Sequence, residues 1–138
     1  MSTTGFTCTA SSEYHSGYSC SNVYDSNTDS EWATLGQGAG AWIEIQFPST
    51  VKISKIETRY RYGGTVSGEN FKAITLLFSD GTIHSATLED GTNPEWNVVQ
   101  MSLTVTTNSI KISATSLHGP TANPGFSEIR FYNCPDVA

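Results

Sequence analysis

The sequence has 138 residues, which is enough for one domain with its own hydrophobic core, and we predict a single domain over residues 1–138. Only 14% of the residues are charged, the net charge is −6 and the seven basic residues are scattered, so no nucleic acid is expected as a partner and attraction to anionic membranes is disfavoured. No run of about 18 apolar residues occurs, which argues against membrane insertion.

The first informative segment in chain order is the loop at residues 24–32. It offers side-chain oxygens at Asp25, Asn27, Asp29 and Ser30. Hard cations such as calcium take about six to eight oxygen ligands. The loop matches only the first half of an EF-hand pattern, because Ser30 stands where that pattern has glycine and no helical pattern flanks it. A turn rich in Asn and Asp that holds no metal is the alternative.

The rest of the chain alternates between apolar and polar residues, which is typical of strands. We expect strands at residues 43–47, 56–62, 74–78, 83–88, 96–105, 110–117 and 127–133. Because helical periodicity is essentially absent, the sequence predicts an all-β fold, an antiparallel β-sandwich.

The connections between these strands should alternate between two ends of the sandwich. The short segments 48–50, 79–81 and 106–108 read as tight hairpin turns at one end. The long segments 63–70, 89–95 and 118–125 fall at the other end, together with the Asp25 loop. Long loops on a rigid sandwich are where binding residues usually lie, so we expect the functional site there.

Three cysteines leave more than one arrangement open. By the same count of directions, Cys8 and Cys134 both fall at the short-turn end and could pair, whereas three free thiols would indicate a reducing compartment. Cys20 lies in a loop, as a free thiol or an intermolecular link. The spacings do not fit a zinc site.

An ordered set of motifs resembles a known family. The set comprises Asp25, Asn27, Ser30 and Trp32, preceded by Ala-Ser-Ser-Glu-Tyr at 10–14, followed by Trp-Ile-Glu-Ile-Gln-Phe at 42–47, and closed by Gly-Phe-Ser-Glu-Ile-Arg-Phe-Tyr at 125–132. It resembles the discoidin domain, also called the coagulation-factor C-type or galactose-binding-like domain, and the related family 32 carbohydrate-binding modules. The resemblance covers nearly the whole chain and implies a jelly-roll β-sandwich.

The resemblance also implies roles for particular residues. A structural calcium ion (Ca2+) would be held by Val23, Asp25, Asn27, Ser30 and Glu128, the last reaching in from the closing strand. A disulfide would join Cys8 to Cys134 and tie the ends of the domain together. Trp32 and Trp42 would be core residues.

The long-loop end carries both chemistries that a sugar site needs, a flat aromatic face and fixed donors and acceptors. The candidate ligand-binding residues are Tyr14, His15, Arg61, Tyr62, Asn70, Trp96, His118 and Asn123. A structural role is the alternative for each of them; Arg61, for example, would then only pair with acidic neighbours on an exposed strand.

These observations favour binding over catalysis. The sequence contains no motif for a nucleophile, a catalytic metal or a phosphate, so we expect no enzyme. Our interpretation is a lectin-like domain for galactose-type sugars, with glycans or glycoproteins as partners. An adhesion module that binds proteins is the alternative, and phospholipid binding ranks below both.

The setting of the protein is less constrained. A homo-oligomer would add avidity to a single-domain lectin. The first residues lack the basic start and apolar stretch of a signal peptide, and we nevertheless expect an extracellular or secreted location.

Overall fold

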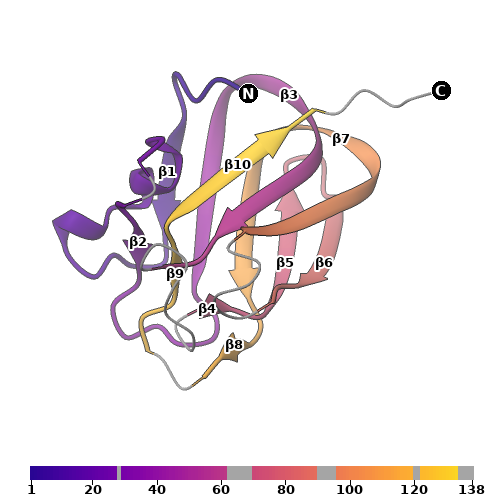
Figure 1. Cartoon of the computed structure of the whole chain (residues 1–138). Coiled ribbons are helices and arrows are strands. Elements are labelled where there is room, and N and C mark those ends of the chain that lie inside the picture. The colour runs from indigo at the N-terminus through magenta and orange to yellow at the C-terminus, as the bar shows by residue number, and fades with distance from the viewer. Residues whose placement is uncertain (28, 62–69, 90–95, 120–121, 134–138) are drawn as a thin grey trace.

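Figure 1 shows the computed structural model, which describes residues 1–27, 29–61, 70–89, 96–119 and 122–133. In chain order its elements are β1 (Thr7–Ala10), η1 (Ser16–Tyr18), η2 (Cys20–Tyr24), β2 (Trp32–Ala33), β3 (Trp42–Arg59), β4 (Asn70–Phe71), β5 (Ala73–Phe78), β6 (Ile83–Thr87), β7 (Trp96–Ala114), β8 (Leu117–His118), β9 (Gly125–Phe126) and β10 (Glu128–Tyr132). The two η elements are short 3-10 helices. No helix in the described part of the chain is long and apolar enough to cross a membrane.

Two long strands build both layers of the sandwich. β3 and β7 pair with each other along most of their length and arch from one layer to the other (Figure 1). The first part of β3 also pairs with β1, and its last part pairs with β10. The last part of β7 pairs with β5, which pairs with β6. Every described pairing is antiparallel, so the predicted antiparallel β-sandwich is confirmed.

The prediction of tight hairpins at residues 48–50 and 106–108 was wrong. Both segments lie inside continuous strands, β3 and β7, and the register shifts between Gln46 and Val51 where the ribbon bends. A bend of this kind lets one strand serve both sheets. The turn at 79–81 is present, as predicted. The prediction that segments 79–81 and 106–108 lie at the same end of the sandwich is also correct, because the backbone N–H of Ser79 donates to Thr107 Oγ1 at 3.0 Å.

A single apolar cluster fills the space between the layers. At the end opposite the bends it is aromatic: Phe126 and Phe71 have ring centroids 4.6 Å apart, and both contact Trp32. Isoleucines of β3, β5 and β7 contribute to the rest, together with a second aromatic group formed by Phe6, Phe47 and Phe131. Because Trp32 is fully buried, its predicted core position is confirmed.

The predicted core position of Trp42 was wrong. Its neighbours Ala41 and Ile43 are fully buried, so the alternation of a strand turns the indole to the outer face of the sheet. There it is half-buried beneath the Lys111 ammonium group, 4.4 Å from the ring centroid.

Candidate functional site

Three aromatic side chains form an exposed cluster between β1 and β2. The ring centroids of Tyr14 and Tyr18 are 5.4 Å apart, and those of His15 and Tyr18 are 4.7 Å apart. His15 caps η1, because its Nδ1 accepts a hydrogen bond of 2.9 Å from the backbone of Gly17. Since the Tyr14 side chain is 45% exposed, the loop presents a preformed aromatic surface to solvent. Two of the predicted ligand-binding residues, Tyr14 and His15, therefore lie together.

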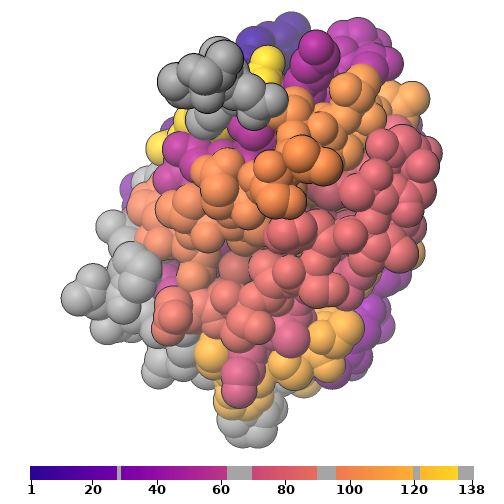
Figure 2. All heavy atoms as spheres, turned by 90° about the vertical axis from the view of Figure 1, so that its right-hand side faces the viewer, coloured from indigo at the N-terminus to yellow at the C-terminus, as the bar shows by residue number. Residues whose placement is uncertain are grey.

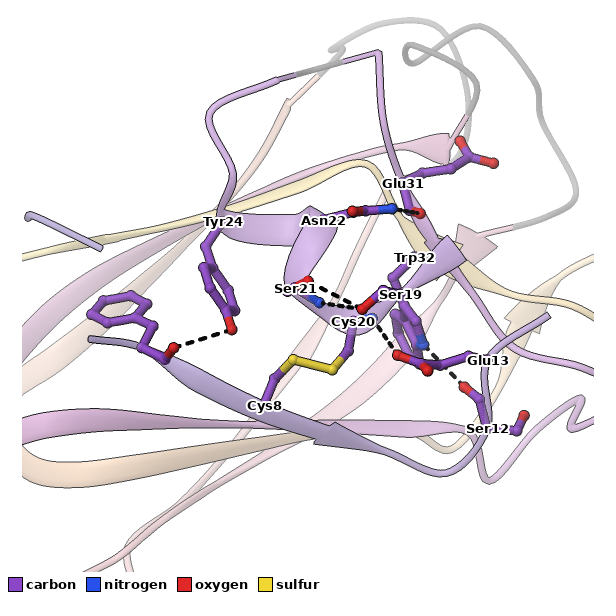
Figure 3. The surroundings of a disulfide bond; sticks show 11 residues. Cys8, Ser12, Glu13, Ser19, Cys20, Ser21, Asn22, Tyr24, Glu31 and Trp32 are labelled. Atoms are coloured by element: carbon purple, nitrogen blue, oxygen red, sulfur yellow. Dashed lines mark hydrogen bonds between the residues drawn. A yellow bond between two sulfur atoms is a disulfide. The ribbon is translucent and has the colours of Figure 1, made fainter. Parts of the chain in front are cut away.

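Hydrogen bonds hold this aromatic loop against the core. The backbone N–H of Tyr14 donates to the Ala33 carbonyl at 2.8 Å. The indole N–H of Trp32 donates to the Ser12 carbonyl at 3.1 Å, a contact visible in Figure 3. The Ser12 hydroxyl in turn accepts from the backbone of Leu35 at 2.9 Å. The core tryptophan thus fixes the base of the loop.

A disulfide closes the same loop (Figure 3). It joins Cys8 of β1 to Cys20 of η2, with the Cα atoms 6.2 Å apart. The prediction of a Cys8–Cys134 bridge was therefore wrong, and so was the role of Cys20 as a free or intermolecular thiol; Cys134 lies outside the described residues. The prediction failed because η2 folds back onto β1, where the Glu13 carboxylate accepts a 2.6 Å hydrogen bond from the backbone of Cys20.

Arg61 lies beneath the aromatic cluster and is buried, with only 3% of it exposed. Its guanidinium carbon is 6.0 Å from the centroid of the Tyr18 ring. Its Nε and Nη2 donate to Oε1 of Glu31 at 3.0 and 2.8 Å, and its Nη1 donates to the Asn123 carbonyl at 2.6 Å. Arg61 thereby joins three chain segments below the exposed rings.

Two asparagines among the candidates support this arrangement. The side-chain oxygen of Asn123 accepts from the backbone of Gly36 at 2.9 Å, which ties the segment before β9 to the glycine-rich segment before β3. Asn70 is buried, and its side-chain oxygen accepts from the backbone of Arg61 at 3.2 Å. The structure therefore brings Tyr14, His15, Arg61, Asn70 and Asn123 to one end of the sandwich.

The other candidates make different contacts. The guanidinium carbon of Arg130 lies 4.4 Å from the centroid of the Trp96 ring. His118 is opposite Asn70 in the β4–β8 pair, and its Nε2 is 2.8 Å from the Leu88 carbonyl oxygen. Tyr62 lies outside the described residues. A role of Trp96 or His118 in ligand binding stays a prediction.

The side chains of the predicted cation loop bond mainly to the loop itself. The two carboxylate oxygens of Asp25 accept from the Asn27 backbone at 2.8 Å and from the Ser30 hydroxyl at 2.5 Å. The side-chain oxygen of Asn27 accepts from the backbone of Asp29 at 3.0 Å. No group of three or more His, Cys, Asp or Glu side chains suited to a metal occurs among the described residues.

Glu128 faces this loop from the start of β10. Only 3% of it is exposed, and its Oε1 is buried without a hydrogen-bond partner in the described part of the chain. Burial, and then the nearby charge of Asp25, raises the pKa of Glu128 to about 7, against weaker opposing effects of Arg130 and the Ser26 backbone. An unsatisfied carboxylate oxygen beside a second carboxylate is an arrangement that a bound cation would stabilise.

Glu31 is a site residue that the sequence interpretation missed. It is buried and forms the ion pair with Arg61. Because it lies near the end of the oxygen-rich loop at residues 24–32, the sequence pattern indicated no role of its own for it. The available signal was its position next to Trp32 in a chain with few charges, since a charged residue beside a core tryptophan needs a partner.

The architecture is that of discoidin-type, or F5/8 type C, domains and of family 32 carbohydrate-binding modules. An F5/8 type C domain from Bacteroides fragilis is similar with a TM-score of 0.77 and 14% identity, covering 96% of this chain and 93% of that one. A family 32 module of C. perfringens NanJ in complex with galactose has a TM-score of 0.72 and 18% identity, covering 93% of each chain. A Paenibacillus chitosan-binding module in complex with chitotriose has a TM-score of 0.70 and 18% identity, covering 92% of this chain and 95% of that one.

At the level of sequence, residues 3–132 match the family described as a domain of unknown function, DUF7402. The chain belongs to this family. No curated protein matches the sequence.

Proposed function

We propose that the domain binds a carbohydrate, without turning it over, on the aromatic cluster of Tyr14, His15 and Tyr18. The observation that carries this proposal is the group of three contacting rings, in which Tyr14 and His15 are exposed and each packs edge-to-face on Tyr18, fixed by η1, the Trp32 hydrogen bond and the disulfide. Aromatic faces cover the C–H side of a pyranose, and a preordered surface loses little entropy on binding.

The ligand of this site is an uncharged sugar, with a galactose-type glycan or glycoprotein as the first candidate. Support comes from the charge balance, because the Arg61 guanidinium beneath the rings is paired with the Glu31 carboxylate. A uronic acid would find a cation whose charge is already compensated. The galactose complex of the NanJ module and the chitotriose complex of the Paenibacillus module show that domains of this fold take sugars.

Calcium is part of this proposal as a structural ion. Asp25, Asn27, Ser30, the Val23 carbonyl and Glu128 would hold it, and the unsatisfied Oε1 of Glu128 is the observation that supports it. When bound, the ion supplies a positive charge between the loop and β10. These residues would then clamp the loop that follows η2.

We also infer an extracellular or secreted location. The supporting observation is the Cys8–Cys20 disulfide, because such bonds persist in oxidising compartments.

The test is a glycan array probed with purified protein in calcium and again after chelation, followed by calorimetry on the best hit. Tyr14→Ala should weaken binding at least about tenfold, because a stacked ring contributes roughly 1–3 kcal/mol with its buried area. Tyr132→Ala, which removes a half-buried aromatic on another face, is the control and should bind normally. A blank array with folded, calcium-loaded protein would contradict the proposal.

A further inference from the structure

One side of the sandwich exposes two strand edges, and Figure 2 faces it. Among the described residues, β6 pairs with β5 alone, and the part of β7 before residue 110 pairs with β3 alone. Natural sheets usually protect such edges with charged residues or proline. β6 reads Ile-His-Ser-Ala-Thr and carries neither.

The hydrogen-bonding pattern identifies which groups of β6 are available. The backbone N–H of Phe78 donates to the Thr82 carbonyl at 3.0 Å, and that of Leu88 donates to the Lys72 carbonyl at 2.7 Å. Because bonded and non-bonded pairs alternate in an antiparallel ladder, the N–H and C=O groups of Ile83, Ser85 and Thr87 point away from β5. The side chains of these three residues are also exposed.

The strand segments that border these edges carry no charged residue and expose large apolar side chains. Residues 81–88 and 96–110 contain no Asp, Glu, Lys or Arg, in a chain whose net charge is −6. Ile83 is 64% exposed and Leu103 is 78% exposed, and both border a hollow of about 160 Å³ whose wall includes Met101 and Val105. Leu103 projects from a bulge, because residues 101–104 of β7 oppose Ser54 alone.

We propose that this side pairs with a second copy of the chain, β6 against β6, antiparallel about a two-fold axis at Ser85. In this register Ser85 faces its own copy and Ile83 faces Thr87 of the other copy. The outward donors of each strand then meet the outward acceptors of the other. No charged residue lies within residues 82–88 of either copy, and the nearest acidic residues, Asp80 and Glu89, lie just beyond the ends of this stretch.

The charge distribution argues for a second copy as the occupant. Two chains of net charge −6 repel each other least where neither carries a charge, and a basic partner would find no acidic group along residues 82–88, since Asp80 and Glu89 lie just beyond them. A second copy offers the same open strand, which is neutral over residues 82–88 and places Thr87 opposite the exposed Ile83.

The proposed pairing also fits a binding domain. β1, which leads into the aromatic loop, lies at the opposite edge of the sheet from β6. Both aromatic clusters would therefore stay open in the dimer. A dimer with two sugar sites binds a surface that carries many glycans more tightly than a monomer with one site does.

The experiment is sedimentation velocity on the full chain over a wide range of concentration. Ser85→Lys and Ser85→Glu each place like charges opposite one another at the axis, and each should weaken dimerisation about fivefold. An equimolar mixture of the two variants should dimerise at least as well as the unchanged chain, because lysine then faces glutamate. Leu35→Lys, at an apolar residue that is 57% exposed in the segment between β2 and β3, is the control and should leave the dimer intact.

Three results would overturn the proposal: a chain that is monomeric at every concentration, a dimer that both Ser85 variants leave unchanged, or variants whose mixture fails to restore association. Circular dichroism of each variant checks that it is folded.

Discussion

The guanidinium of Arg61 and the carboxylate of Glu31 form a buried ion pair, with Nη2 2.8 Å from Oε1. A third nitrogen of the same group bonds the Asn123 carbonyl, so one side chain joins the segment before β2 to the segment before β9. A buried pair needs further hydrogen bonds to offset the loss of water around its charges, and the bond from Nη1 to the Asn123 carbonyl is one of them. The pair lies beneath the rings of the proposed sugar site.

Replacing one member of this pair should be more harmful than replacing both. Arg61→Met leaves the Glu31 carboxylate buried without its partner and should lower the free energy of unfolding by about 3–5 kcal/mol. The double variant Glu31→Leu with Arg61→Met should lose clearly less. Urea denaturation of the two variants measures this. If Arg61→Met unfolded at the same urea concentration as the unchanged chain, the pair would not be a structural element of the site.

Gly125 should not tolerate even a methyl group. A Cβ built there would lie 1.9 Å from the carbonyl oxygen of Trp32, a backbone atom that cannot swing away. Gly125→Ala should therefore separate β2 from β9 and cost more than about 3 kcal/mol, the range of severe overpacking.

The matched control is Gly36→Ala. Gly36 has a φ of +69° and open space around it, so alanine there meets only the backbone penalty of about 1 kcal/mol. Thermal unfolding of the two variants gives the comparison. Equal decreases in melting temperature for Gly125→Ala and Gly36→Ala would contradict the packing argument.

The sequence predicted features that repeat along a strand and missed those that depend on the path of a loop. Ile43 and Ile45 alternate with polar residues and are buried, whereas Trp42, which the family resemblance led us to expect in the core, lies out of phase with them and on the outer face. The partners of Cys20 and Arg61 were not predictable, because η2 and the Glu31 segment fold back across the sheet without any periodic signal.

The Cys8–Cys20 bond should stabilise both the domain and its aromatic loop. The two cysteines are separated by 12 positions, and closing a loop of that size contributes about 3 kcal/mol in the chain-entropy model. Replacing both with serine should lower the melting temperature and weaken sugar binding, since Tyr14 and Tyr18 lie inside the closed loop. Cys134→Ser is the control. Peptide mapping without reduction should recover the Cys8–Cys20 pair, and a Cys8–Cys134 peptide would contradict the structure.

Glu128 should make stability depend on pH when calcium is chelated. Its pKa is raised from 4.5 to about 7 in the folded chain, so the folded state holds a proton that the unfolded state has already released. The free energy of unfolding should therefore fall as the pH rises from about 4.5 to about 7, by an amount on the order of 3 kcal/mol, and level off above. Glu128→Gln stays neutral at every pH and should lack this decrease. The difference between the pH profiles of the two chains therefore measures the contribution of Glu128 to the free energy of unfolding.

Calcium should restore the stability that the folded chain loses at high pH. A cation needs the ionised carboxylate, so it should stabilise the unchanged chain increasingly above pH 7, where the proton no longer competes. Glu128→Gln should gain little, because it offers the ion no charge. Thermal melts with calcium and with chelator at pH 6 and pH 8 test both statements. A calcium effect of equal size in the two chains would place the ion elsewhere, and no effect in either would remove calcium from the proposed function while leaving the aromatic site to be judged on its own.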